Sequence, residues 1–443
     1  MSVPRCTGPL TIPAAVPRRA LPGLPGRRPE TAGQRPGRPE TDCQWRLVRS
    51  SAWFTAQRAS PCFRSVRTAA SVATTITRPY GEGEGHMSTG GSRRPAEPAP
   101  DAAPAGAGTG RRSAERRAER RAERISAGAT ELEHRLADLL RGGLADMERP
   151  SGKAGRGVWE ETAARMVDAQ APGLAARVRE LGSVPGSGPG WPSRLLEECA
   201  LLHLLGQGFL NIGGLPEPLA ATVRSRVGIT TRAAEVLADR DAVVRDHWLV
   251  LGRHDTEEGR VRARRVWLYG RRTGRTALVL SFAAGRLPEP PLPVGTSVDA
   301  GLAYYPGAPA LRAALGERHA EPGPGGRPPG AGVHDALASY GAALCGDPWL
   351  EGWPVVLAGV VPVPVGEGWQ LADEGGSALP VAGTAGVRSR MWRLAAVSGG
   401  EPVTVFGECG HRGFTPYTVW PNSEAGAGAA VPLTPTETPG GAR

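Results

Sequence analysis

Residues 115–144 read ERRAERRAERISAGATELEHRLADLLRGGL, and this stretch decides how the first folded part of the chain begins. Its second half repeats apolar residues at the three- and four-residue spacing of a single helix face, namely Ile125, Leu132, Leu136, Leu139, Leu140 and Leu144. Ser113 has the hydroxyl side chain that commonly caps a helix N-terminus. The pattern therefore predicts a long amphipathic helix that starts at Ser113 and packs its leucine face against other helices.

Four further helices are predicted after this one. Residues 159–169 have helical periodicity, a break follows near Pro172, and the pattern resumes up to Leu181. Pro192 suits the first position of a third helix, in which Leu195, Leu196, Cys199 and Leu202 share an apolar face. Shorter helical patterns cover 216–227 and 230–239. We therefore predict a helical domain over 113–242.

The hydrophobic period changes near Asp246, where Val, Leu, Trp and Tyr become frequent. Such composition favours strands, and Gly259 and Gly274 separate the first three into an antiparallel meander. The predicted strands are 247–253, 261–269, 276–282, 355–363, 369–372, 392–397, 403–406 and 414–420. Helices are predicted at 309–319 and 333–344, with no regular element over 322–332. The fold class is therefore α+β, with residues 243–421 forming an α+β domain rich in antiparallel strands.

The formal charge of +10 is concentrated near the N-terminus. Residues 1–124 hold 22 Arg against 10 acidic residues, whereas from Met87 onward 40 basic residues face 38 acidic ones. We expect 1–86 to be a basic leader that is disordered or reflects a start assigned upstream of Met87. The Ser/Gly/Pro/Ala-rich residues 87–112 are expected to be a flexible linker, and 422–443 a disordered tail.

The motifs of several enzyme classes are missing. Lys153 is the only lysine among 53 basic residues. It is followed by Ala154, whereas a phosphate-binding loop requires Ser or Thr there. Neither a Gly-x-Ser-x-Gly elbow nor a His-Glu-x-x-His helix occurs. We therefore expect no enzyme activity and no cofactor.

Two pairs, each of one Cys and one His, are candidate metal ligands. Cys199 and His203 lie four residues apart on a predicted helix, but a free Cys on a leucine face is typically a core residue. Cys409 and His411 flank Gly410 where two strands turn, so a hairpin explains the glycines and a metal site is the weaker alternative. The six cysteines are scattered, and no apolar run could span a membrane, which together favour the cytoplasm.

The arginine-rich start of the first helix is the candidate nucleic-acid-binding element. Its arginines could dock on phosphates or on an acidic partner, although such charge runs are more often solvated. No aromatic residue lies between them, which argues against stacking on single-stranded bases. The candidates are Arg112, Arg116, Arg117, Arg120, Arg121 and Arg124.

Residues 111–421 resemble the bacterial SWIM zinc-finger family, in the region that follows the finger. The resemblance is carried by 115–144, by WEETAARMVDAQ at 159–170, by GWPSRLL at 190–196, and by 392–420 with FGECGHRGF at 406–414. The family's zinc site uses Cys-x-Cys followed by Cys-x-His, and Cys-x-Cys is absent here. The resemblance implies a non-catalytic interaction protein with an unidentified protein partner. The alternative is nucleic-acid binding through the arginine-rich helix start, with zinc only if a finger is encoded separately.

Overall fold

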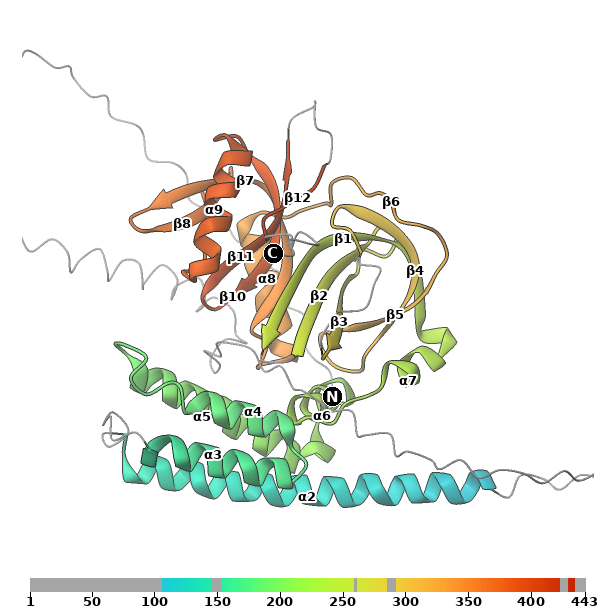
Figure 1. Cartoon of the computed structure of the whole chain (residues 1–443), viewed down its shortest axis with the longest axis vertical. Helices are drawn as coiled ribbons and strands as arrows, with labels where there is room; N and C mark the ends of the chain where they lie inside the picture. The colour runs from blue at the N-terminus through green and yellow to red at the C-terminus, as the bar shows by residue number, and fades with distance from the viewer. Residues whose placement is uncertain (1–105, 145–152, 259–260, 285–291, 423–428, 435–443) are drawn as a thin grey trace, which may run out of the picture. The chain divides into compact units, whose positions relative to one another are not determined.

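The computed structural model describes residues 106–144, 153–258, 261–284, 292–422 and 429–434 (Figure 1). A helical region comes first and mainly antiparallel sheets follow, so the α+β prediction is confirmed. The predicted leader 1–86, most of the linker and residues 435–443 lie outside the described residues. Within those residues, no helix is both long and apolar enough to cross a membrane.

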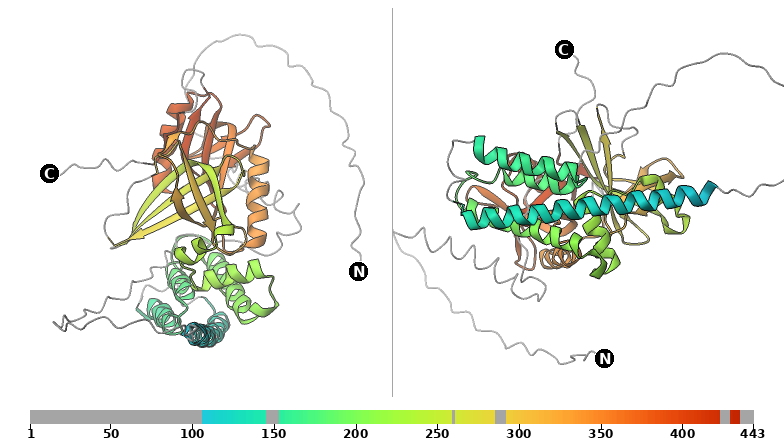
Figure 2. Two further views of the ribbon diagram at one scale, coloured as in Figure 1. Left: turned by 90° about the vertical axis from the view of Figure 1, so that its right-hand side faces the viewer. Right: turned by 90° about the horizontal axis from the view of Figure 1, so that it is seen from below.

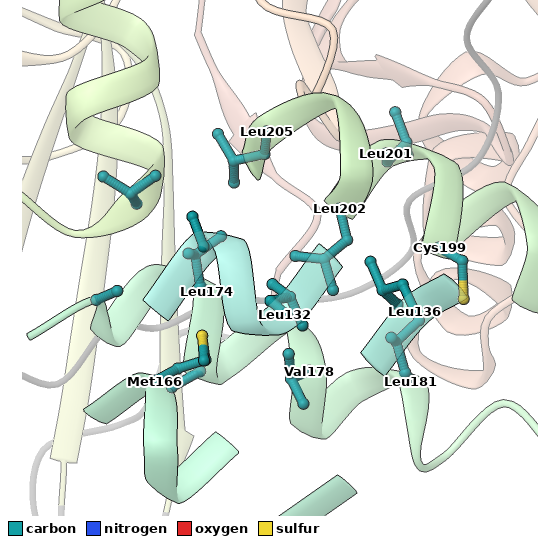
Figure 3. Packing of buried hydrophobic residues seen from close by; sticks show 14 of the residues in the cluster. Leu132, Leu136, Met166, Leu174, Val178, Leu181, Cys199, Leu201, Leu202 and Leu205 are labelled. Carbon is teal, nitrogen blue, oxygen red and sulfur yellow. The ribbon is translucent and has the colours of Figure 1, made fainter. Parts of the chain in front are cut away.

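The helical region consists of α2 Gly106–Gly142, α3 Lys153–Asp168, α4 Pro172–Leu181, α5 Trp191–Leu210, α6 Glu217–Val227 and the short α7 Ala233–Ala238. Figure 3 shows leucines from α2, α4 and α5 meeting in one apolar core, with Met166 of α3 among them. The predicted break between α3 and α4 occurs at Gln170, which has a positive φ of 60°. Pro192 lies in the first turn of α5, as predicted.

Helix α2 differs from its prediction at its beginning. It starts at Gly106, seven residues before Ser113, so the end of the predicted linker 87–112 is helical. The alanines and long charged residues after Gly110 are good helix formers, and Ser113 lies inside the helix rather than at its first residue. The apolar face is also narrower than predicted, since Leu140 is 46 % exposed.

The first sheet has the strand order β3-β2-β1-β4-β5, with β6 paired to β4. Its strands are β1 Val243–Glu258, β2 Val261–Gly270, β3 Thr276–Ala283, β4 Thr296–Tyr304, β5 Ala313–Arg318 and β6 Gly323–Pro324. A parallel bridge between Leu278 and Arg312 joins β3 to the start of β5, so the two ends of the sheet meet. The curled sheet encloses a core around Trp248, whose indole N–H donates to the carbonyl of Ala300 (3.0 Å).

The second sheet has the order β12-β11-β10-β7-β8-β9. It consists of β7 Gly352–Val365, β8 Gly368–Ala372, β9 Ala378–Pro380, β10 Val403–Gly410, β11 Gly413–Pro421 and β12 Val431–Pro432. One face packs against α8 Val333–Gly346 and α9 Ala385–Ser398. The other face contributes Phe406, Tyr417 and Trp420 to a cluster with the first sheet, in which Trp267 stacks on Tyr417 with 4.7 Å between ring centroids.

Several predicted elements were wrong. Residues 392–397 belong to helix α9 because Val387, Met391 and Leu394 form a helical apolar face that extends N-terminal to the predicted strand. The predicted helix 309–319 contains strand β5, since pairing with β4 outweighs its alanine-rich propensity. Residues 322–332 include β6, and β12 lies within the predicted tail 422–443. Strands β4 and β9 were not predicted.

The helical region and the sheets share direct contacts. Trp349, which follows α8, is 2 % exposed within the helical core, and its indole N–H donates to the carbonyl of Leu201 (2.9 Å). Arg226 of α6 forms an ion pair with Asp347. That pair is 121 residues apart in sequence, so the contact depends on the tertiary fold.

Candidate functional site

The N-terminal part of α2, residues 112–124, is exposed along its length, and we call it the arginine segment. None of its residues is buried, and from residue 112 onward the first buried position of the helix is Ile125. Figures 1 and 2 show this end of α2 running past the other helices of the bundle. Four of the six candidate arginines are exposed here without folding back onto the bundle: Arg112, Arg116, Arg117 and Arg120.

The other two candidate arginines support the fold instead. Arg121 is half-buried and donates from Nη2 to the carbonyl oxygen of Gly228 (3.1 Å), which follows α6. Arg124 donates from Nη2 to Oε1 of Gln170 (3.0 Å), the residue at the α3–α4 break. The six arginines predicted from the sequence therefore divide into four exposed residues and a pair that contacts other helices, and of this pair Arg121 is half-buried while Arg124 is also exposed.

Cys409 and His411 lie in the β10–β11 hairpin, as predicted. Cys409 is 1 % exposed in the apolar core between sheet and helices, and this burial raises the pKa of its thiol to about 12. Burial, assisted by Arg412, lowers the pKa of His411 to about 4. A neutral imidazole can bind a metal, and a buried thiol stays protonated unless a metal displaces its proton.

Cys199 is a core residue, as predicted, while its predicted neighbours on the helix face are not all buried. Burial, with a smaller effect of Glu198, raises the pKa of the Cys199 thiol to about 11. The predicted apolar face holds at Leu195, Cys199 and Leu202, which are buried. Leu196 is 46 % exposed, and His203 is exposed and contacts the carboxylate of Glu133 on α2, so these two residues do not belong to it. Across the described ranges, no three His, Cys, Asp or Glu side chains are grouped so that they could hold a metal ion.

A polar cluster between the two sheets was not predicted from the sequence. The Tyr417 hydroxyl donates to Oε2 of Glu408 (3.0 Å), and burial raises the pKa of the Glu408 carboxyl. The rings of His254 and Tyr417 lie 5.5 Å apart, and the guanidinium group of Arg390 of α9 lies over the Tyr417 ring, 5.2 Å from its centroid. Burial, followed by Arg390 and Arg265, lowers the pKa of His254 to about 4.

This cluster has a structural explanation. Its members come from both sheets and from α9. His254 is far in sequence from Arg390, Glu408 and Tyr417, so no local motif indicates the cluster. Groups with such shifted pKa values are often found at active sites. Here each shift follows mainly from burial between packed elements, so we treat the cluster as part of the contact between the sheets.

An open hollow lies on the first sheet, lined by Asp246, His247, Arg271, Arg272, Ser297, Pro324, Gly325 and Gly326. The Asp246 carboxylate has a structural role here, because its oxygens accept four hydrogen bonds of 2.7–3.0 Å. The donors are the backbone N–H groups of His247, Arg272 and Thr273 and the Thr273 hydroxyl. Although burial opposes ionisation, these hydrogen bonds lower the pKa of Asp246. The residue closes the β2–β3 turn.

The fold thus defines an α+β protein whose N-terminal helical bundle carries an exposed basic helix. Residues 120–227, from within α2 to the end of α6, match the family model described as the SWIM-associated four-helix bundle domain. The match confirms the resemblance for this region, which is consistent with the part of a SWIM-family protein downstream of the finger. No curated protein and no solved structure matches the chain.

Proposed function

We propose that this chain is a non-catalytic interaction protein of the cytoplasm whose arginine segment contacts an acidic protein partner. The observation that carries this proposal is the exposure of Arg112, Arg116, Arg117 and Arg120 on a helix whose C-terminal half is anchored in a buried core. Because the segment is already helical, binding would cost less ordering entropy than it would for a flexible basic tail.

The charge pattern of the segment supports a specific partner over general attraction to anions. Glu119 and Glu123 are exposed beside the arginines, so the net positive charge is smaller than the arginine count suggests. Alternating charge of this kind contributes more to specificity and orientation than to affinity. A partner would need acidic groups placed to match the arginines and to avoid the glutamates.

We also propose that the chain acts without catalysing a reaction and without a cofactor. It is supported by the missing lysine and nucleophile motifs, and by the missing Cys-x-Cys half of the finger. It is also supported by the saturated Asp246 carboxylate in the surface hollow.

Nucleic-acid binding is the second candidate, favoured by the same four exposed arginines. Each phosphate neutralised on duplex DNA releases counterions, and the logarithm of the binding constant then falls with the logarithm of salt concentration with a slope of about −0.9 per contact. Four such arginines would give a slope of roughly −3.6. Zinc-dependent binding would require a finger that this chain does not encode.

The test is binding of the full chain to a twelve-residue polyglutamate peptide and to a 20-base-pair duplex, at salt concentrations between 50 and 200 mM. The variant replaces Arg112, Arg116, Arg117 and Arg120 with Gln, and the charge-opposite control replaces Glu119 and Glu123 with Gln. We expect the first variant to lose at least tenfold in peptide affinity and the control to gain affinity. Equal binding by wild type and the four-arginine variant would overturn the proposal, and preferential binding of the duplex would favour the second candidate.

A further inference from the structure

Helix α9 carries an exposed tryptophan on a basic surface. Trp392 is 64 % exposed, the highest value among the exposed large hydrophobic side chains of the described residues. Arg388 and Arg393 are exposed as well. Arg388 precedes Trp392 by one helical turn, about 6 Å along the axis, and Arg393 follows it directly. We call these three residues the α9 surface.

The fold holds Trp392 in this exposed position. The opposite face of α9 places Val387, Met391 and Leu394 in the core of the second sheet, each at most 3 % exposed. Rotating the helix to bury Trp392 would therefore expose that core. The indole also packs edge to face against Trp369 of β8, with centroids 5.1 Å apart and an interplanar angle of 86°. The ring is thus oriented before any ligand binds.

Among the residues that the structure describes, none neutralises the charge of the α9 surface. Helix α9 contains three arginines and no acidic residue. Arg390 points toward β11, donating to the carbonyl of Pro416 (3.4 Å) and lying over the Tyr417 ring. Within the described part of the chain, neither Arg388 nor Arg393 has a hydrogen bond or an ion pair. Their guanidinium groups are available to an anionic ligand.

We propose that the α9 surface binds single-stranded nucleic acid, with a base stacked on Trp392 and neighbouring phosphates paired with Arg388 and Arg393. Any base presents a flat face that can stack on an aromatic ring, and positively charged side chains nearby attract the phosphate backbone. In a duplex both faces of each base are already stacked, so a single strand is required. The α9 surface supplies the aromatic group that the arginine segment of α2 lacks.

A protein partner fits this surface less well. Stable protein interfaces cover about 800 Å² on each partner and have an apolar centre built from several residues. The apolar part of the α9 surface is one indole supported by Trp369. Its neighbours on the helix are Arg388 and Ser389 one turn before and the small residues Ala395 and Ala396 one turn after. One indole with guanidinium groups on the same helix can take one base and its neighbouring phosphates.

This proposal is independent of the function proposed for α2, because it rests on a different helix and a different ligand. The test measures fluorescence anisotropy of a labelled twelve-nucleotide oligothymidylate with the full chain at 50 mM salt. Trp392→Ala is expected to weaken binding at least tenfold, and Trp392→Phe to stay within about threefold of wild type. The double variant Arg388→Gln, Arg393→Gln is expected to bind more weakly and with a smaller salt dependence.

The four-arginine variant of α2 is the matched control, and it should retain oligothymidylate affinity within about threefold. Because Trp392 is largely exposed, circular dichroism should show a folded Trp392→Ala variant with only the small loss of stability expected from its contact with Trp369. The proposal is overturned if wild type does not bind the oligonucleotide, or if Trp392→Ala binds as wild type does. It is also overturned if the matched duplex binds as tightly as the single strand. Competition by polyglutamate that depends on Trp392 would instead assign the surface to an acidic protein.

Discussion

At the scale of single residues, burial determines which ionisable groups retain their ordinary behaviour. His254 illustrates this point, since its pKa falls from 6.5 to about 4 through burial and the nearby guanidinium groups of Arg390 and Arg265. The folded protein therefore favours the neutral imidazole of His254 over the protonated one. The same burial that joins the two sheets makes their contact sensitive to acid.

The pH dependence of stability follows from this shift. Between about pH 6.5 and 4 the unfolded chain binds a proton at His254 that the folded chain does not, so this contribution to stability is present above pH 6.5 and lost as pH falls. One proton accounts for at most about 1.4 kcal/mol per pH unit. We expect His254→Gln to have a shallower loss of unfolding free energy between pH 7 and 4.5, measured by urea denaturation.

The exposed His334 provides the control for this measurement. His334→Gln should keep the wild-type pH profile, because its side chain lies in solvent in both states. A His254→Gln profile that runs parallel to wild type over the whole range would contradict the assignment.

At the scale of elements, α2 combines a buried half and an exposed half in one helix. Its C-terminal half packs Ile125, Leu132 and Leu136 into the bundle, and its N-terminal half extends the arginine segment into solvent (Figure 1). The helical repeat places the core residues on one face. The arginines are held in place only because the same helix continues N-terminal to that face. The anchoring half therefore determines the position of the exposed half.

Leu132→Ala tests how firmly α2 is anchored. Leu132 is fully buried, and truncation of a buried leucine removes contacts and leaves a cavity, which costs about 2–5 kcal/mol. Leu140→Ala changes the same residue type on the same helix at a site that is 46 % exposed, where we expect about 1 kcal/mol or less. Chemical denaturation of both variants measures the difference, and equal losses would show that the helix is not anchored through Leu132.

At the scale of the whole molecule, the helical region and the sheets are joined by a charged contact. Asp347 is 7 % exposed and pairs with Arg226 of α6. Although burial opposes the charged guanidinium, Asp347 raises the pKa of Arg226. The carboxylate also accepts from the backbone N–H of Trp349 (3.1 Å), the residue that inserts into the helical core. One side chain thus supports both contacts.

Asp347→Asn is expected to destabilise the protein by about 2–4 kcal/mol, since it leaves a largely buried guanidinium without its counter-charge. Glu217→Gln removes the exposed pair with Arg224 and should cost about 0–1 kcal/mol. Unfolding followed separately by circular dichroism and tryptophan fluorescence compares the two variants. If Asp347→Asn costs no more than Glu217→Gln, the buried pair does not hold the two regions together.

The helices were largely predictable from the sequence because their signals are local. The leucine spacing after Ile125, the break near Pro172 and Pro192 at the start of α5 act within a few residues. The β10–β11 hairpin was predictable for the same reason, since Gly413 takes a φ of 111° at the turn. These features needed no knowledge of the rest of the chain.

The candidate sites were only partly predictable. The sequence predicts all six arginines as one basic group on α2, but Arg121 and Arg124 have partners 107 and 46 residues away. The sequence pattern predicted a strand beginning at Trp392. The prediction was wrong because the apolar positions that define α9 begin five residues earlier, at Val387. Its exposure beside two arginines could be seen only after the helix had been placed on the sheet.

What the sequence by itself determined was the α+β class, the helical bundle and the basic start of α2, because short-range periodicity and charge encode them. Only the tertiary structure decided which arginines face solvent, which cysteines are buried, and that Glu408, Tyr417 and His254 meet between the sheets. Those outcomes depend on pairings between residues far apart in the chain. The free energy that stabilises them comes from burial at contacts between distant residues, and a local sequence pattern does not contain that information.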